Sequence, residues 1–146
     1  MIEVEIREVH TSDRTEINEI NQLVAKEGVH DLRSYASDED LEVYASEEDY
    51  EFFVAVSCDK LIGYVEMHYY EVQSMILQLF VHPNFRNKGV GRKLINRLIT
   101  EVQSKARYLE IYLQVKEGSR AIGLYKSEGF VEAKKVKDGV EMVRKI

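Results

Sequence analysis

The chain of 146 residues has the usual size of one domain, which we place at 1–146, and no apolar run reaches the roughly 18 residues that span a membrane. Its 26 acidic and 20 basic side chains give a net charge of −6 at pH 7, the wrong sign for binding nucleic-acid phosphates. Cys58 is the only cysteine and the N-terminus lacks a secretory signal, so we expect no disulfide, no metal site and a cytoplasmic location.

The N-terminal part of the sequence predicts a strand, a helix and an acidic segment. Residues 3–9 alternate between apolar and charged side chains, which is typical of a half-buried strand. Asp13 and Glu16 have the spacing of a capping box. It would begin a helix with the apolar stripe Ile17, Ile20, Leu23 and Val24. Residues 37–51 are strongly acidic and support one short helix at most.

The middle of the sequence predicts three strands. Residues 52–56 and 61–70 are rich in β-branched and aromatic side chains, and residues 57–60 between them suit a tight turn, so these segments predict a hairpin. Residues 75–81 are apolar at nearly every position, which is typical of a strand covered on both faces. We expect this strand to be central in the sheet.

The C-terminal part predicts a long helix, a strand, a short helix and a hairpin. Residues 89–105 carry apolar side chains at helical spacing, and residues 108–115 predict a strand. Ser119 can begin a short helix that runs through Glu128. A final hairpin is expected from 131–136 and 140–144, with Asp138 and Gly139 in its turn.

Residues 79–94 carry the clearest chemical signal, because a buried strand is followed by two close glycines and the start of a helix. Gly89 and Gly91 let a ligand approach the backbone, and the free N–H groups of a first helical turn bind phosphate oxygens. The surrounding basic side chains are Arg86, Lys88, Arg92 and Lys93. The segment therefore predicts an anion site, although the glycines would also serve to ease a strand-to-helix turn beside a solvated basic helix.

Two sequence blocks resemble the GNAT superfamily of acetyl-CoA-dependent N-acetyltransferases. Residues 86–91 match the signature Arg/Gln-x-x-Gly-x-Gly/Ala, and residues 121–130 match a second block of that family. The resemblance covers about residues 52–130. It implies a single-domain α/β (α+β) fold with a mixed sheet of six to seven strands, a splayed central strand pair and about four helices.

The resemblance also implies a site for acetyl-CoA as co-substrate. The pantetheine arm would lie along the backbone of Leu79, Phe80 and Val81, in the gap beside the next strand. The pyrophosphate would lie on the loop that Arg86 begins, against the amides of Asn87, Lys88, Gly89, Val90, Gly91 and Arg92. Tyr125 matches the family tyrosine that acts as general acid toward the departing CoA thiolate. The alternative is that Tyr125 has only a packing role in its short helix.

The residue that takes the amine proton stays open. Many members of the family carry a glutamate where this chain has no acid, and here Gln78 and Gln114 stand in the corresponding strands. Glu66 and His68 share one face of their strand, so either is a possible base, directly or through water. Alternatively, this polar strand face has no catalytic role and is simply covered by the acidic helices. A third alternative is that no base is needed, because an amine of lowered pKa can arrive partly neutral.

We therefore predict an N-acetyltransferase in which a primary amine attacks acetyl-CoA directly in a ternary complex; the alternative is a CoA-binding sensor or interaction module with little catalysis. Residues 1–60 have a net charge of −12 and residues 61–146 a net charge of +6. We expect a cationic small molecule or peptide as acceptor, unless these acids only face solvent. The hairpin at 131–144 would be available for pairing in a homodimer.

Overall fold

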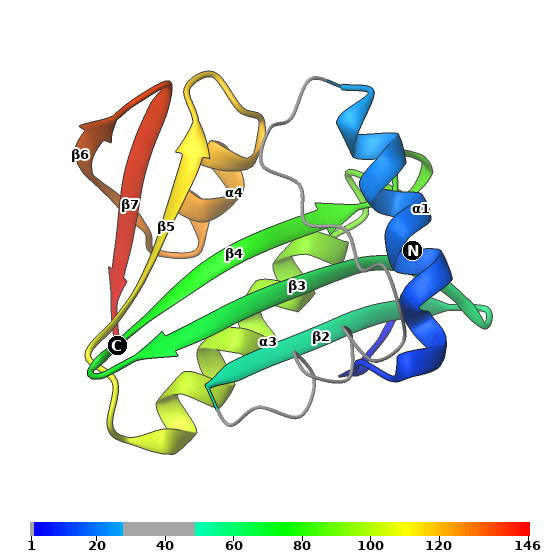
Figure 1. Cartoon of the computed structure of the whole chain (residues 1–146), viewed down its shortest axis with the longest axis horizontal. Coiled ribbons are helices and arrows are strands. Elements are labelled where there is room, and N and C mark those ends of the chain that lie inside the picture. Colours follow the sequence, from blue (N-terminus) through cyan, green and yellow to red (C-terminus); the bar gives the residue numbers. More distant parts are fainter. Residues whose placement is uncertain (1, 28–48) are drawn as a thin grey trace.

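The computed structural model describes residues 2–27 and 49–146, which form one mixed sheet and the helices that pack on it (Figure 1). The strands are β1 (Glu5–Glu8), β2 (Tyr50–Ser57), β3 (Lys60–Tyr70), β4 (Gln73–Val81), β5 (Glu110–Lys116), β6 (Val131–Val136) and β7 (Gly139–Lys145). The helices are α1 (Arg14–Ala25), α3 (Val90–Lys105) and α4 (Ala121–Ser127), with 3-10 turns at Thr11–Asp13 and Pro83–Phe85. Among these residues, no helix is long and apolar enough to cross a membrane.

The order of the strands confirms the expected mixed sheet with a central β4. Within the described chain the seven strands are arranged β1-β2-β3-β4-β5-β7-β6, where β4 and β5 are parallel and the other neighbours are antiparallel. Both predicted hairpins are present, and Cys58, Asp59 and Asp138 adopt the positive φ angles that tight turns require. Most of the acidic segment expected to hold a short helix, up to residue 48, lies outside the described residues; Tyr50 and Glu51 begin β2.

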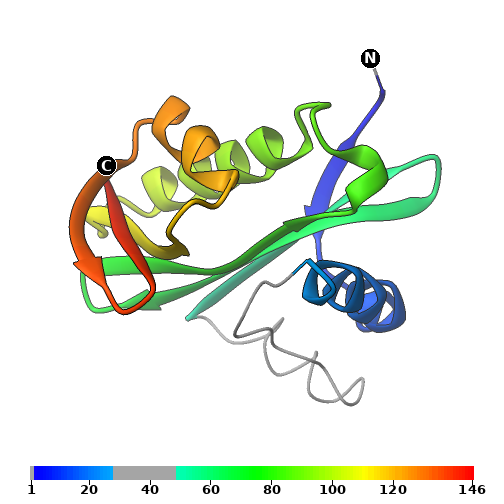
Figure 2. The same cartoon turned by 90° about the horizontal axis from the view of Figure 1, so that it is seen from above.

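The helices lie on both faces of the sheet. Figure 2 shows α3 and α4 above the sheet and α1 below it. The larger core lies on the α3 side, where Leu94, Ile95 and Leu98 pack against strand residues such as Val65 and Met67. A smaller core on the α1 side joins Ile17 and Ile20 to Tyr64 and other strand residues. β3 and β4 therefore each contact a helix on both faces, which explains the apolar residues on both sides of these strands.

The predicted capping box of α1 is wrong. The Asp13 carboxylate accepts a hydrogen bond from the backbone N–H of His10 (2.8 Å) and forms two more with the Arg7 guanidinium (2.9 and 3.0 Å). Glu16 instead accepts a hydrogen bond from the N–H of Leu61 (2.9 Å) in β3. Asp13 thus caps the 3-10 turn before α1, and the contacts of Asp13 with Arg7 in β1 and of Glu16 with Leu61 in β3 fasten α1 to the sheet.

The sheet opens between its two central strands. β4 pairs with β5 only from Gln73–Glu110 to Ile76–Leu113, after which the strands diverge. At the same level β4 carries a β-bulge, because Glu66 pairs with Gln78 and Met67 with Ile76, which leaves Leu77 without an opposite residue. The splayed pair expected from the family resemblance is thus present, and it begins at a bulge.

Candidate active site

The open side of β4 presents backbone groups that β5 does not pair. The N–H of His82 donates to the carbonyl oxygen of Ile62 in β3 (2.8 Å). Because backbone direction alternates along a strand, Leu79 and Val81 point their N–H and C=O groups the other way. The ladder with β5 has already ended at Ile76. Leu79 and Val81 therefore form a strand edge inside the sheet that no strand covers, on which an extended ligand can add like a strand. The Val81 carbonyl oxygen already accepts a hydrogen bond from Nε of Arg86 (3.3 Å), so a ligand there would share or replace this contact.

The loop that follows β4 ends in an open helix N-terminus. Gly89 precedes α3 with a φ of +82°, and a Cβ atom placed there would meet nothing within 4 Å. The first helical hydrogen bond joins the N–H of Lys93 to the carbonyl oxygen of Gly89 (3.1 Å), so the N–H groups of the preceding turn have no helical acceptor. The free space and these donors fit the pyrophosphate of acetyl-CoA.

Gly91 connects this loop to the helix that carries Tyr125. A Cβ atom on Gly91 would lie 2.9 Å from a methyl group of Leu124 in α4, closer than real Cβ contacts. The glycine therefore lets the start of α3 pack directly against α4. The second glycine of the motif has a packing role, whereas the first leaves open space.

Two of the four basic side chains of the predicted anion site are already in ion pairs. Arg86 donates two hydrogen bonds of 2.6 Å to the Glu27 carboxylate, which follows α1, and Arg92 pairs with Glu128 at 2.8 Å. Lys88 and Lys93 are exposed. Of the four basic side chains expected near the anion site, Arg86 and Arg92 are thus partly neutralised by carboxylates.

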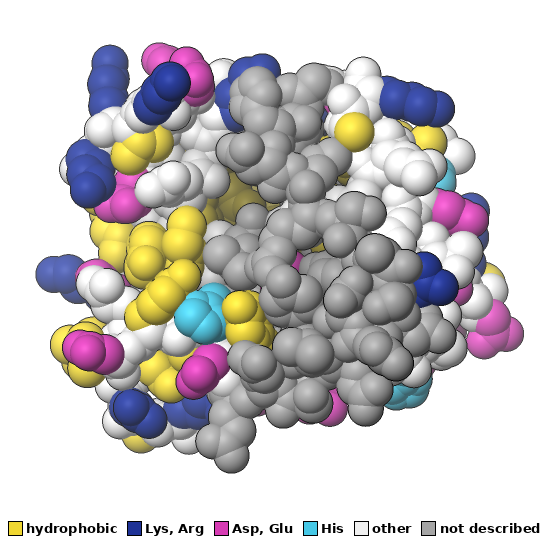
Figure 3. Space-filling view, viewed as in Figure 1, with side chains coloured by type: hydrophobic (Ala, Val, Ile, Leu, Met, Phe, Trp, Pro, Cys, Tyr) yellow, Lys and Arg dark blue, Asp and Glu magenta, His cyan; other side chains and the backbone are white. Residues whose placement is uncertain are grey.

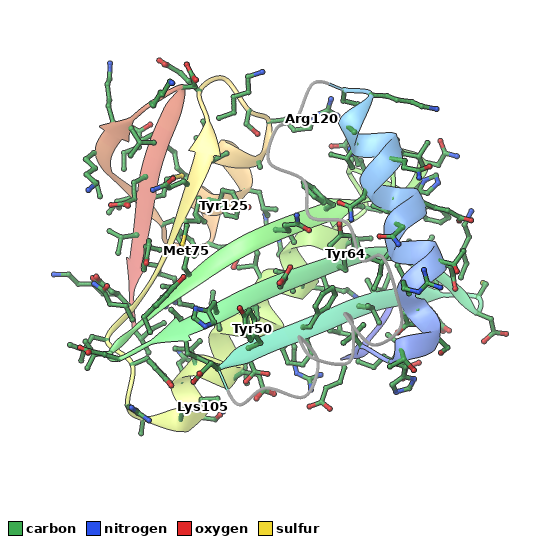
Figure 4. All side chains as sticks on the ribbon, viewed as in Figure 1. Tyr50, Tyr64, Met75, Lys105, Arg120 and Tyr125 are labelled. Carbon is green, nitrogen blue, oxygen red and sulfur yellow. The ribbon has the colours of Figure 1, made fainter. Side chains whose placement is uncertain are left out.

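Glu27 also reaches across the opening of the sheet. Its carboxylate lies 3.8 Å from Arg120, in the segment between β5 and α4, while Arg86 follows β4 (Figure 4). The guanidinium of Arg86, by donating hydrogen bonds, lowers the pKa of Glu27. Sequence reasoning missed this residue because its partners lie far along the chain.

Tyr125 lies in α4 near the diverging strands. Its side chain is 6% exposed and packs edge-on against Phe130, with ring centroids 5.6 Å apart. Figure 4 shows it close to the opening between β4 and β5. Burial raises the pKa of Tyr125, so the phenol stays protonated at neutral pH and can donate a proton or a hydrogen bond.

The α1 face of the same opening carries a buried polar cluster. Glu66 is fully buried, and its cross-strand neighbour Gln78 is 4% exposed. The Tyr64 hydroxyl donates to Asn21 in α1 (2.7 Å) and lies 3.3 Å from Oε1 of Gln78. The Nε2 atom of Gln78 is buried without a hydrogen-bond partner in the described part of the chain. The Nε2 atom of Gln78 can therefore donate a hydrogen bond to a ligand or a water molecule, and the sequence alone does not reveal this.

The two candidate bases have different surroundings. Glu66 stands opposite Gln78 at the bulge, whereas His68 stands opposite Met75 on the paired part of β4. The imidazole of His68 lies between two tyrosine rings, with centroids 4.4 Å from Tyr50 and 4.3 Å from Tyr70. The two side chains share a face, as expected, and Glu66 is the one that lies level with the opening, one strand away from it.

Comparisons with known proteins agree with this geometry. Residues 48–132 match the model of the acetyltransferase (GNAT) domain family. An uncharacterized N-acetyltransferase of Methanocaldococcus jannaschii is 34% identical over 95 residues, which cover 64% of this chain and 40% of the relative. The ribosomal protein bS18-alanine N-acetyltransferase of Salmonella typhimurium is 34% identical over 62 residues, which cover 42% of this chain and 41% of the relative. The chain thus spans about two fifths of the length of these curated relatives.

Among solved structures, the PaiA N-acetyltransferase of Thermoplasma acidophilum in complex with coenzyme A superposes with a TM-score of 0.87. The two sequences are 22% identical, and the match covers 99% of this chain and 100% of the other. The fold is therefore shared over the full described length.

Proposed function

Because the chain belongs to the GNAT acetyltransferase family, we propose that it transfers the acetyl group of acetyl-CoA to a primary amine. The observation that carries this proposal is the free edge of β4 at Leu79 and Val81, directly before the open helix N-terminus at Gly89. An extended pantetheine arm and a pyrophosphate need these two features in this order. The chain supplies both within a dozen residues.

In the proposed reaction both substrates bind before any bond changes. The amine nitrogen attacks the thioester carbonyl, the new C–N bond forms, and the C–S bond then breaks. A backbone N–H of the segment from Leu79 to Val81 stabilises the oxyanion. Tyr125 donates a proton to the CoA thiolate as it leaves, and the amine loses its extra proton to a base.

Glu66 is the base that the geometry favours, acting directly or through a water molecule, and His68 is the alternative. Glu66 stands beside the bulge, one strand away from the gap, whereas His68 is held between tyrosine rings. Matched variants Glu66→Gln and His68→Gln separate the two, since a true base is needed for the rise of kcat/KM with pH. Loss of that rise only in His68→Gln would reverse the assignment.

A CoA-binding module with little catalysis is the second candidate. It is favoured by Gln78, which stands where an acid would serve as base, and by the full burial of Glu66. In this case acetyl-CoA binds normally but no amine is acetylated. Retention of Tyr125 near the opening supports the enzyme instead.

A cationic acceptor belongs to the same proposal. Of the acids that suggested it, Asp49 and Glu51 are described, and Glu51 is partly engaged, because its carboxylate accepts a hydrogen bond from Tyr69 (3.1 Å) and lies 3.5 Å from Lys105. If charge steers the acceptor, kcat/KM for a cationic amine falls as salt rises while that for a neutral amine does not. Parallel salt dependence would contradict steering.

The test is an acetyl-transfer assay that follows thiol release and product mass together. The purified chain is supplied with acetyl-CoA and a panel of amines, and acetylated products are identified by mass spectrometry. Amine-dependent release of CoA with a matching product supports the enzyme. Tight acetyl-CoA binding without any product favours the CoA-binding module.

A further inference from the structure

An apolar and aromatic row crosses the sheet on the α1 face. Successive cross-strand partners place one side chain of each of six neighbouring strands in a line, because directly paired residues point to the same face. From β2 across to β6 the row consists of Tyr50, His68, Met75, Tyr112, Val143 and Val131. No charged residue interrupts it.

This row is accessible in its middle. His68, Met75 and Tyr112 are each partly exposed, and Tyr70, whose ring packs against His68, is 44% exposed. Figure 3 shows hydrophobic side chains gathered around a histidine on this face. A contiguous patch of this kind on a protein surface marks a contact site for an apolar group.

The row lies directly beside the opening of the sheet. Met75 and Tyr112 form the last but one rung of the β4–β5 ladder, which ends at the next residue pair. The row above it contains Glu66 and Gln78 on one side of the gap and Gln114 with Glu141 on the other. Polar and acidic groups thus stand at the point where the strands part, and apolar groups stand immediately below them.

The distance between the two rows limits what a ligand can be. Two residues along a strand span roughly 6.6 Å, which is close to the reach from an amine nitrogen across two carbons into a phenyl ring. A ligand whose amine lies at the gap, next to the thioester, would place its third and later atoms on Met75 and Tyr112. A polyamine would put its second ammonium group there and would desolvate it against apolar atoms.

We infer that the acceptor is a primary amine that carries an aromatic or branched apolar group about two carbons from its nitrogen, and that Met75 and Tyr112 hold that group. The inference rests on the proposed acetyl transfer and narrows its acceptor. The same chemistry is found in a free arylalkylamine and in the N-terminal residue of a peptide that begins with a bulky apolar side chain. The assay distinguishes these two sources.

The experiment compares matched acceptors that differ only in the apolar group. Phenethylamine is compared with ethylamine and 1,4-diaminobutane, and Phe-Gly-Gly with Gly-Gly-Gly, all with acetyl-CoA at saturation. We expect kcat/KM to be roughly tenfold or more higher for the aromatic member, because burying a phenyl ring contributes at least one such factor. Preference in the free-amine pair alone or in the peptide pair alone identifies the source.

Two variants on the same row locate the contact. Tyr112→Thr removes a ring beside the gap, and we expect it to reduce the preference for the aromatic acceptor at least severalfold. Val131→Thr is the matched control, since Val131 lies in the same row at the sheet edge and is 61% exposed. Acetyl-CoA affinity, unchanged in both, reports that the fold is intact; if Tyr112→Thr does not fold, the wild-type acceptor series still decides.

The possible failures are distinguishable. Acetyl transfer without preference, or with preference for 1,4-diaminobutane, overturns this inference and leaves the proposed function standing. No transfer to any amine overturns the proposed function, and binding of phenethylamine to the CoA-loaded protein is then measured by calorimetry. Binding that Tyr112→Thr abolishes would still support the apolar subsite, and absence of binding would overturn it.

Discussion

The two ends of the β4–β5 pair are built from similar strands but behave differently. From Gln73 to Ile76 the strands are paired, and the α3-side residues there, such as Ile111 and Leu113, are buried. From Leu77 onward the strands part, and Leu79, Val81 and Val115 are only partly buried. The paired end of the two strands thus contributes side chains to the hydrophobic core. The open end exposes backbone N–H and C=O groups to which a ligand can hydrogen-bond.

The largest expected effect comes from weakening the paired end. Ile111→Ala should lower the free energy of unfolding by about 2–5 kcal/mol, because Ile111 is fully buried in the α3-side core. Val115→Ala, on the same strand at the open end, should cost less than about 1.5 kcal/mol, since Val115 is only partly buried. Urea denaturation measures both losses of unfolding free energy. Equal losses would show that the paired end does not contribute more to stability than the open end.

The next effect concerns the open end alone. Gly89→Asp places a carboxylate in the free space before α3, where the pyrophosphate is expected, and should weaken acetyl-CoA binding by roughly 100-fold. The control is Gly89→Asn, which matches Asp in size and in tolerance of positive φ but lacks the charge. Calorimetry on both variants separates charge from backbone conformation. Unchanged affinity in a folded Gly89→Asp protein would place acetyl-CoA elsewhere.

Removing one hydroxyl at the opening should affect only the chemical step. Tyr125→Phe should lower kcat by roughly 100-fold with little change in acetyl-CoA affinity. Because burial raises the pKa of Tyr125, its ionisation should contribute no limb to the wild-type pH profile between about pH 6 and 9. If kcat is unchanged while chemistry is rate-limiting, Tyr125 only packs against Phe130.

The smallest effect is expected where Glu27 joins the two sides of the opening. Glu27→Gln should lower the free energy of unfolding by up to about 1 kcal/mol at pH 7, because the carboxylate is about a third exposed and screened by water. The hydrogen bonds from Arg86 hold the pKa of Glu27 below its usual 4.5. The advantage of wild type is therefore present above that value and is lost as the pH falls through the lowered pKa.

Thermal unfolding of both proteins at pH 7 and near pH 3 measures this difference. Glu101→Gln is a matched control, since the Glu101 carboxylate is 30% exposed and pairs with Arg97 (3.2 Å) away from the opening. A difference between wild type and Glu27→Gln that persists at the lower pH would mean that the charge of Glu27 is not the cause.

Local patterns predicted most of the fold. The spacing of Val90, Leu94, Leu98 and Val102 identified α3, and the turn residues at 57–60 and 138–139 identified both hairpins. The features that local patterns did not predict depend on pairing between distant segments. Glu16 accepts a hydrogen bond from Leu61, 45 residues away, instead of completing the expected box with Asp13, and the bulge at Leu77 follows from the register of two whole strands.

The candidate site divides in the same way. The loop at 86–92 and Tyr125 could be proposed from the sequence because their residues are contiguous or belong to a recognisable block. Glu27 could not, since its partner Arg86 is 59 residues away. The buried Nε2 of Gln78, which has no hydrogen-bond partner among the described residues, also needed the structure, because its surroundings depend on α1 and β3 together.

The free edge at Leu79 and Val81 has a consequence for how such proteins diverge. A ligand held through main-chain N–H and C=O groups makes few demands on the side chains, so most substitutions there leave the contact intact. Proline is the exception, since it removes the N–H itself.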